Sequence, residues 1–329
     1  MASNRIPDLP ANTTLQGLSV LVTGSNQGLG YHAALLSLQL GASPVYLAVR
    51  NLKKGHEART AMLADPVVRK KNSKAIVKVY ELDMARWDSV KSFAEKFIGD
   101  RHAAGEGLDI AMLNAGLYHM RFELAPTGNE LTVQVNHLST ALLSLLLLSI
   151  LEASTIPKHT ARLMIVSSGQ HRQASSTLTE CPSDDNYLTS LNDVKNFASM
   201  TRYGLSKMLV IFFLRVLATK VSSDRVIINN VCPGLIRTNL ARELPVFLRP
   251  VLYLLFLGQA NPVERGAACY IHGVTCVGKE SHGLWYRRMV LTPYGDFLLS
   301  DEGKKMQDKI WTETLQQLEQ VVPGVSSNI

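Results

Sequence analysis

Short apolar runs alternate along the chain with longer segments of helical periodicity. The runs are rich in β-branched residues, are bounded by turn residues, and cover Ser19–Thr23, Pro44–Val49, Ala75–Leu82, Asp109–Leu113, Arg162–Ser167 and Val226–Val231. Apolar strands separated by helices are typical of a parallel sheet that is covered on both faces. The pattern therefore predicts an α/β fold: one doubly wound domain over residues 1–329, with a parallel sheet of about seven strands and helices on both faces.

Three of the intervening helices can be predicted from their periodicity. A helix over Tyr31–Leu40 ends before Gly41, and glycine commonly closes helices. The segments Leu138–Leu151 and Tyr203–Lys220 are apolar nearly all round, so each helix must be buried on more than one side. The sheet covers one side, and either a second subunit or loops of the same chain cover the other. We expect a homodimer through the helices at about 138–151 and 203–220.

Two segments look like insertions at the carboxyl ends of strands, where open α/β sheets bind their ligands. Residues 169–202 are polar, with Ser, Thr and Asp throughout, whereas residues 239–262 are apolar. We expect both segments to be lids over a binding site. The second segment would form an apolar pocket mouth, or would simply pack on the sheet, through Leu244, Val246, Phe247, Leu252, Tyr253 and Phe256.

The composition excludes several classes of protein. The chain of 329 residues is 46% hydrophobic and 19% charged, so it can bury a full core. The net charge is +7, but Lys and Arg are scattered apart from Arg69–Lys71, so we expect no nucleic-acid partner. Ala141–Leu151 and Val246–Gly258 are shorter than the ~20 apolar residues of a transmembrane span. No Cys/His spacing suits zinc and Met1–Thr14 lacks an apolar signal segment, which indicates a cytoplasmic protein without a metal ion.

A glycine-rich turn follows the first predicted strand and opens the first helix. Its sequence is Thr23-Gly24-Ser25-Asn26-Gln27-Gly28-Leu29-Gly30. Glycines let the backbone approach a pyrophosphate closely, and a helix N-terminus supplies free N–H groups and partial positive charge. The turn therefore favours a dinucleotide site, although its spacing differs from GxGxxG and an ordinary strand-to-helix turn is the alternative.

Basic residues follow the second predicted strand, in Val49-Arg50-Asn51-Leu52-Lys53-Lys54. Folds that bind NAD usually place an acid near here for the ribose 2′-hydroxyl, whereas an arginine suits a 2′-phosphate. Arg50 offers a planar fork that matches phosphate. The segment predicts NADP(H), with Arg50 as the main contact and Asn51 and Lys54 beside it. The alternative is an exposed helix that begins with basic residues.

Tyr203 and Lys207 lie four residues apart in Arg202-Tyr203-Gly204-Leu205-Ser206-Lys207. Residues i and i+4 share one face of a helix, so the phenol and the ammonium are expected side by side. A cation about 4 Å away, at an effective dielectric constant near 20, would favour the phenolate by up to ~4 kcal/mol. Such a tyrosine could exchange a proton with a substrate oxygen near neutral pH.

Together these motifs resemble the short-chain dehydrogenase/reductase family. The chain has Thr23-Gly24-x3-Gly28-x-Gly30, Asp83, Asn114-Ala115-Gly116, Asn136, Ser167-Ser168, Tyr203-x3-Lys207 and Pro233-Gly234 in the family's order, over about residues 17 to 240. Asn136-His137-Leu138 and Val49-Arg50-Asn51 are similar to the retinol-dehydrogenase-like branch. The tail resembles fungal members, many of which are similar to reductases of secondary-metabolite pathways. The resemblance implies a Rossmann-type domain with NADP(H) as cofactor.

The resemblance also implies roles for individual residues. Asp83, with Met84 next to it, would accept from the adenine amino group, or Asp83 would cap a helix. Asn114, Ala115 and Gly116 would form the floor under the adenosine ribose, while Pro233, Gly234, Ile236 and Thr238 would seat the nicotinamide carboxamide. Asn136 would hold a water in a proton relay towards Lys207, or would stabilise a helix bend. His119 and His171 are expected to be structural.

The catalytic serine is either Ser167 or Ser168, because strand alternation lets only one of them point into the site. The family pattern favours Ser168. The implied catalytic set is therefore Asn136, Ser168, Tyr203 and Lys207, acting on a ketone or aldehyde of a lipophilic small molecule with Tyr203 as proton donor. Two alternatives stay open: the same machinery running as an alcohol dehydrogenase, or an NADP-binding protein that catalyses an isomerisation or cyclisation.

Overall fold

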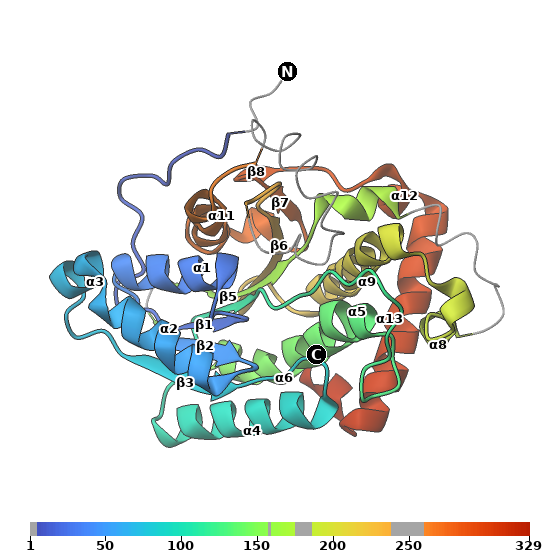
Figure 1. The fold of residues 1–329 in the computed structure, drawn as a ribbon, viewed down its shortest axis with the longest axis horizontal. Coiled ribbons are helices and arrows are strands. Elements are labelled where there is room, and N and C mark those ends of the chain that lie inside the picture. The colour runs from blue at the N-terminus through green and yellow to red at the C-terminus, as the bar shows by residue number, and fades with distance from the viewer. Residues whose placement is uncertain (1–4, 157–158, 175–185, 238–259) are drawn as a thin grey trace.

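Seven parallel strands and one short antiparallel strand form a single sheet in the described part of the chain (Figure 1). The computed structural model describes residues 5–156, 159–174, 186–237 and 260–329. The strand order is β3-β2-β1-β4-β5-β6-β7-β8. The strands are β1 (Val20–Thr23), β2 (Val45–Val49), β3 (Val77–Glu81), β4 (Ile110–Leu113), β5 (Ala161–Val166), β6 (Val226–Cys232), β7 (Trp285–Arg287) and β8 (Val290–Leu291). The predicted doubly wound α/β fold and all its predicted strands are confirmed, and β7 and β8 extend the sheet.

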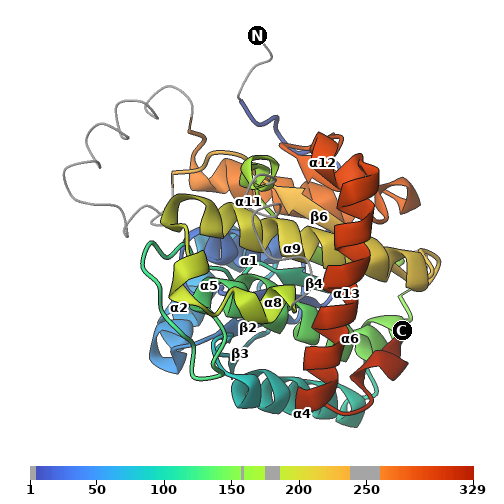
Figure 2. The ribbon, with the colours of Figure 1, turned by 90° about the vertical axis from the view of Figure 1, so that its right-hand side faces the viewer.

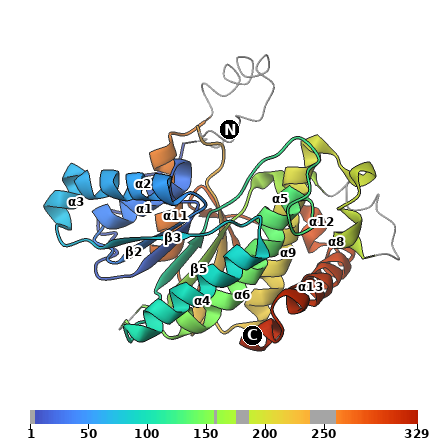
Figure 3. The same cartoon turned by 60° about the horizontal axis from the view of Figure 1, so that its bottom comes forward.

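Helices cover both faces of the sheet (Figures 1 and 3). One face carries α1 (Gly28–Gln39), α2 (Leu52–Ala64), α3 (Pro66–Lys71) and α11 (Val263–Thr275), and the other carries α4 (Trp87–Ala103), α6 (Ser139–Glu152) and α9 (Ser199–Lys220). The remaining segments are α5 (Leu131–Val133), the π-helical η1 (Gln134–Leu138), η2 (Gly169–Gln173), α8 (Tyr187–Ser190), η3 (Val194–Asn196), η5 (Lys279–Ser281), α12 (Asp296–Leu299), α13 (Asp301–Val321) and η6 (Val325–Asn328). Each face of the sheet therefore has its own apolar core.

Burial along the strands explains why the sequence pattern was informative. Every residue of β1, β2, β4 and β6 is buried, which is why these strands show no alternation and are apolar apart from residues such as Asn229 and Asn230 of β6. The edge strand β3 is different, because Lys78 and Glu81 are exposed while Val77 and Tyr80 are buried. The predicted helix end at Gly41 is also confirmed, since this glycine has a φ of +97° directly after α1.

The C-terminal helix α13 covers the faces of α6 and α9 that the sheet leaves uncovered (Figure 2). The ring of Trp311 in α13 stacks on Phe213 of α9, with 5.3 Å between ring centroids. Thr314 Oγ1 lies 2.9 Å from His137 Nε2, and Asn328 donates to the carbonyl of Leu145. The same chain therefore buries both helices. The argument for a homodimer through them loses its basis, because it depended on faces that needed a partner.

The longest apolar stretch of the described chain is the helical segment Leu131–Glu152 of 22 residues. By length and hydropathy it could cross a membrane, but 89% of its most apolar window is buried inside the fold. This is the burial of a core helix.

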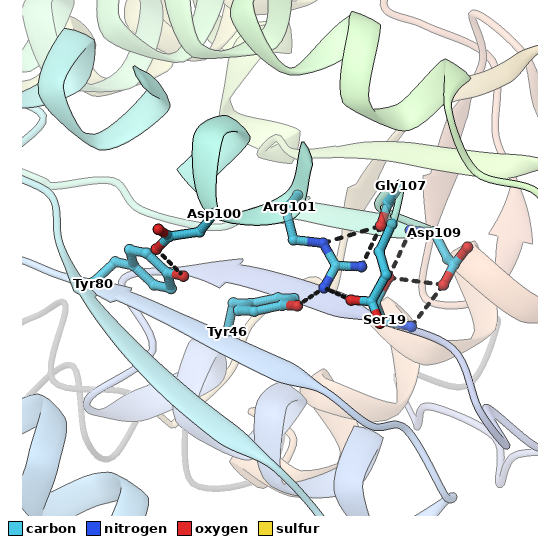
Figure 4. Close-up of polar contacts among 8 residues, drawn as sticks. Ser19, Tyr46, Tyr80, Asp100, Arg101, Gly107 and Asp109 are labelled. Atoms are coloured by element: carbon cyan, nitrogen blue, oxygen red, sulfur yellow. Dashed lines mark hydrogen bonds and ion pairs between the residues drawn. The ribbon is translucent and has the colours of Figure 1, made fainter. Parts of the chain in front are cut away.

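A buried polar cluster fixes the amino edge of the sheet, opposite the strand ends that carry the predicted site (Figure 4). Asp109, before β4, accepts from both the backbone N–H and the hydroxyl of Ser19, before β1, at 2.8 Å each. Arg101 at the end of α4 is only 5% exposed, and it donates to Gly107 O and pairs with Glu106. Because every buried charge here has partners, the cluster fixes the alignment of β1 and β4 rather than forming a reactive site.

Candidate active site

The predicted site residues gather at the carboxyl edge of the sheet. In the strand order, β1 and β4 are neighbours, and the connections leave this point in opposite directions. Such a switch point is where open α/β sheets bind ligands. The glycine turn follows β1, Asn114 follows β4, Ser168 follows β5, and Pro233 follows β6.

The glycine turn has the backbone that a pyrophosphate cradle requires. Gly24 and Gly28 have φ of +68° and +59°, a region that L side chains rarely adopt. A Cβ on Gly30 would lie 2.5 Å from Gly24 O, so α1 packs against the turn without a side chain. Helix α1 has no side-chain cap and no acid in its first turn, which leaves its N–H groups available to an anion. Ser25 is fully buried, and its hydroxyl has no partner among the described residues. These features fit a phosphate group.

Asn114 ties the glycine turn to β4. Its Nδ2 donates to Thr23 O at 2.9 Å, and its Oδ1 accepts from the Tyr270 hydroxyl at 3.0 Å. The backbone N–H of Ala115 donates to Thr23 Oγ1 at 2.9 Å. A Cβ on Gly116 would lie 3.0 Å from Asn136 Oδ1 and 3.3 Å from Lys207 Nζ, so this segment runs from the cofactor turn to the catalytic cluster.

Arg50 lies exposed at the carboxyl end of β2, and in the described part of the chain its side chain forms no hydrogen bond or ion pair. Asn51 has a structural task, because its side chain caps α2 by accepting from Lys54 N at 3.0 Å. Arg50 and the side chain of Lys54 therefore remain the candidates for a 2′-phosphate.

Asp83 follows β3 and is partly buried. One of its carboxylate oxygens accepts from Ala85 N at 3.0 Å, and its own N–H donates to Ser89 Oγ. Asp83 thus stabilises the turn before α4. This is close to its alternative role as a helix cap, although the N-cap residue of α4 is Arg86. The carbonyl of Met84 accepts from Ser139 Oγ at 2.6 Å, so Met84 belongs to the core as well as to this edge.

The two candidate serines have different surroundings. Ser167 is buried, and its hydroxyl donates to Asn230 Oδ1 at 2.7 Å. Ser168 lies beyond the end of β5; its hydroxyl accepts from Gln170 N at 3.3 Å and is close enough to the Tyr203 phenol to oppose the rise in the pKa of that phenol. Only Ser168 therefore faces the tyrosine, as the strand alternation required.

A close contact between α9 and η2 brings this pair together. A Cβ on Gly204 would lie 2.7 Å from Gln170 O, so only glycine allows the first turn of α9 to approach the backbone after Ser168. Tyr203 and Lys207 point the same way from this turn, with Lys207 Nζ 5.8 Å from the centre of the Tyr203 ring. The predicted side-by-side placement of phenol and ammonium is what the structure has.

The electrostatics of the pair differ from the prediction. Burial raises the pKa of Tyr203 above its ordinary value, and the hydrogen bond from Ser168 only partly opposes that rise. Burial also lowers the pKa of Lys207 to about 8. Lys207 Nζ donates to Val166 O at 3.0 Å instead of approaching the phenol oxygen. The expected lowering of the tyrosine pKa by its neighbour is therefore wrong for the protein alone, because desolvation outweighs the ammonium charge.

Asn136 lies in the π-helical turn η1 and is 1% exposed. Its Oδ1 accepts from Leu117 N, and its Nδ2 donates to Leu117 O and to Ser206 Oγ, all at 2.9 Å. The side chain thus clamps the segment after β4 to α9, directly beside Lys207. π-helical turns often occur at functional sites. The turn also fits the alternative role given for Asn136, which is to stabilise a bend in the helix.

Three residues near the pair carried no clear sequence signal. The ring of Tyr118 lies 5.1 Å from that of Tyr203. The thiol of Cys232, at the end of β6, is buried and accepts from Gly169 N and Gly234 N, and burial raises its pKa. Arg287, at the end of β7, lies next to Gly169. Only the position of Cys232 just before Pro233-Gly234 could have indicated its location.

The histidines do not join the cluster chemically. His171 Nδ1 lies 2.7 Å from Ser168 O, its ring is fully buried against Trp285, and burial lowers its pKa to about 4. His119 pairs with Glu123 at the surface.

The nicotinamide seat is described only in part. Gly234 has a φ of +81°, and the stem of Arg288 lies 3.1 Å from where a Cβ would be. Ile236 forms a parallel bridge to Asn261. Thr238, residues 175–185 and most of the expected second lid, through residue 259, lie outside the described residues.

The fold and this site define an oxidoreductase that works with a nicotinamide dinucleotide. The short chain dehydrogenase family model matches residues 19–179 and 187–246, and the chain belongs to this family. It is 40% identical to a short chain dehydrogenase of Arthrobotrys oligospora, over 97% of both chains. It is 35% identical to the short-chain dehydrogenase/reductase tropG of Talaromyces stipitatus, over 95% of this chain and 94% of that protein. The predicted resemblance to fungal members is confirmed.

Solved structures share the fold at low identity. A protein from Mycobacterium paratuberculosis matches with a TM-score of 0.65 and 23% identity, over 93% of this chain and 95% of that one. The Pseudomonas aeruginosa RhlG/NADP complex matches with a TM-score of 0.61 and 20% identity, over 84% and 96% of the two chains.

Proposed function

We propose that the chain reduces a ketone or aldehyde of a lipophilic small molecule to an alcohol, with NADPH as hydride donor. The observation that carries this proposal is the convergence of Ser168, Tyr203 and Lys207 at the strand edge that also bears the glycine turn. A binding protein without catalysis would not need this set. Aromatic residues beside the site, Tyr118 on Tyr203 and Phe122 against Phe197, support a lipophilic substrate.

NADPH, when bound, supplies the hydride that adds to the carbonyl carbon. Ser168 and Tyr203 direct their hydroxyls at the carbonyl oxygen, on which negative charge develops. Tyr203 gives its proton to this oxygen, and the product is the alcohol. Lys207 stabilises the phenolate that remains, and Asn136 holds the neighbouring backbone and a water through which the proton is replaced.

Burial raises the pKa of Tyr203, so the phenol stays protonated at neutral pH, which is the form that a proton donor needs before a reduction. The dehydrogenase direction, which would start from the phenolate, remains the alternative.

Arg50 and Ser25 support NADPH as the cofactor. The guanidinium of Arg50, which has no partner among the described residues, lies where the 2′-phosphate is expected, at the end of β2, and the buried Ser25 hydroxyl lies in the glycine turn. Structures of the same fold include the RhlG/NADP complex and a Shigella flexneri protein with NADP, which accords with this choice.

The direct test is to follow NADPH absorbance in the presence of bulky ketones and to identify the product by mass spectrometry. One alcohol formed for each NADPH consumed is the expected result. Product without NADPH consumption would instead assign an isomerisation or cyclisation to the same site. We place this reaction in a secondary-metabolite pathway in the cytoplasm, and a gene disruption that accumulates a carbonyl compound would test the pathway.

The pKa of Lys207 predicts the alkaline limb of the pH profile. We expect kcat/KM to fall as pH rises through about 8, because the ammonium then loses its charge. The folded-state pKa lies below the unfolded value, so this group adds to stability as pH rises from 8 towards 10, and unfolding does not explain the loss. The arginine of Lys207→Arg stays charged over this pH range. The decrease of kcat/KM at alkaline pH should therefore be smaller in this variant, relative to the activity that it retains. A limb that is unchanged in Lys207→Arg would contradict the assignment.

A further inference from the structure

The hairpin of β7 and β8 brings an arginine to the carboxyl edge of the sheet. Strand β7 pairs in parallel with β6, and Arg287 is opposite Cys232. Trp285 belongs to the core beneath α9, whereas Tyr286 belongs to the core on the other face. Alternation along a strand therefore directs Arg287 to the face of α9, the one that carries Tyr203.

The guanidinium of Arg287 lies against the residue that follows Ser168. Its Nε and Cζ are 3.9 Å and 4.0 Å from the position that a Cβ on Gly169 would take. Burial lowers the pKa of His171 and raises the pKa of Cys232; the charge of Arg287 adds to the first shift and opposes the second, and both residues border the same edge. Arg287 is thus beside the place where a carbonyl held by Ser168 and Tyr203 would be.

The guanidinium is also incompletely paired. Its Nε is buried and has no hydrogen-bond partner among the described residues, and no carboxylate there forms an ion pair with it. A buried guanidinium N–H without a partner is unfavourable, and an anionic oxygen is its natural complement. The turn that follows is the two-residue loop of the hairpin, and the positive φ values of Arg288 and Met289, 53° and 66°, are those of an ordinary type I′ hairpin turn.

The position excludes the cofactor's phosphates as that complement. The glycine turn follows β1, and β4, β5 and β6 lie between β1 and β7. Neighbouring strands are about 4.8 Å apart, so four steps place Arg287 roughly 19 Å from the pyrophosphate cradle. Arg50, on β2, is farther away still. The cofactor's phosphates therefore lie too far away, and no described carboxylate pairs with Arg287, so an anionic oxygen of the substrate is the complement that we consider.

We infer that Arg287 forms a subsite for an anionic oxygen of the substrate, a carboxylate or enolate carried by the same molecule as the reacting carbonyl. This inference rests on the proposed reduction and specifies its substrate class: keto acids or acidic dicarbonyl compounds. In this scheme Arg287 selects anionic substrates, while Ser168 and Tyr203 act on the reacting carbonyl group.

Matched probe pairs test the subsite. We would compare 4-acetylbenzoate and 4-benzoylbenzoate with their methyl esters, in kcat/KM with NADPH and in Kd with the NADP⁺-loaded protein by calorimetry. Wild-type protein should prefer each acid. Arg287→Met should weaken binding and kcat/KM for the acids at least tenfold, leave the esters within about threefold, and leave the Kd of NADPH unchanged.

Two further variants serve as controls. Arg172→Met removes a nearby cation whose guanidinium lies over the Trp285 ring and donates to Pro293 O, so the acid preference should persist. Arg287→Lys keeps the charge and should retain part of the preference. No acid preference in the wild type, equal losses for acid and ester, or a weaker NADPH Kd in Arg287→Met would each overturn the inference. Failure to reduce any ketone would count against the proposed function instead, and the calorimetry would still decide on the subsite.

Discussion

Tyr203→Phe should lower kcat by roughly 10²–10⁴-fold, the range expected when a positioned proton donor is removed. The phenol is hydrogen-bonded to Ser168 and is 8% exposed, so no solvent-exposed group can easily replace it. Phenylalanine keeps the ring and its contact with Tyr118 at 5.1 Å. The fold and the cofactor site should therefore survive. Steady-state measurement of NADPH oxidation with a saturating ketone substrate gives kcat, and calorimetry gives the Kd of NADPH.

Tyr118→Phe is the matched control, because it removes a hydroxyl from the adjacent ring. Its kcat should stay within a fewfold of the wild type, and both variants should bind NADPH with nearly unchanged affinity. Comparable losses in the two variants would show that the aromatic pair acts by packing. Retained activity in Tyr203→Phe would remove the tyrosine from the mechanism.

The structure changes how this tyrosine is understood. An i, i+4 spacing is enough to predict that Tyr203 and Lys207 share a helix face, and that placement is observed. The spacing carries no information on how deeply the two groups are buried or how strongly solvent screens their charges. Burial of both groups raises the tyrosine pKa and lowers the lysine pKa, whereas a surface pair would do the opposite. The sequence thus predicted the contact correctly and its electrostatic consequence wrongly.

The strands at the centre of the sheet were predictable for a physical reason. Strands such as β1 and β6 are buried on both faces, so their apolar runs and turn residues are visible without knowledge of neighbours. Strand β7 has only three residues and ends in Arg287, and its partner β8 is exposed. No local pattern distinguishes such a hairpin from a loop. Arg287 was missed for the same reason.

The C-terminal helix shows a second limit of sequence patterns. The apolar surfaces of α6 and α9 correctly indicated that something covers them, and the choice of a second subunit was wrong as an explanation of their burial. Helix α13 is amphipathic and lies far along the chain, and only its folded position reveals that Trp311 reaches Phe213. Periodicity gives the face that is buried but not the segment that covers it.

Arg50→Glu should invert the cofactor preference. The wild-type kcat/KM should be higher with NADPH than with NADH, and the variant should lose about 100-fold with NADPH, equivalent to roughly 2.8 kcal/mol. The physical reason is that glutamate repels a 2′-phosphate and can accept from the ribose hydroxyls of NADH. Arg50 is exposed and has no partner in the described structure, so the substitution should not change the free energy of unfolding appreciably.

Lys53→Glu is the matched control for the charge change. Lys53 is the second residue of the exposed helix α2, three positions from Arg50, and it makes the same difference to the net charge. If a phosphate is held by the fork of Arg50, Lys53→Glu should cost only a fewfold with NADPH, because a screened surface charge acts weakly at a distance. Equal effects of the two substitutions would mean that the overall positive potential of this surface selects NADPH, rather than a contact from Arg50. A wild-type protein that uses NADH as well as NADPH would refute the role of Arg50. It would leave the chemistry of Tyr203 intact, since Arg50 follows β2 and Tyr203 lies on α9, and the two residues serve opposite ends of the cofactor.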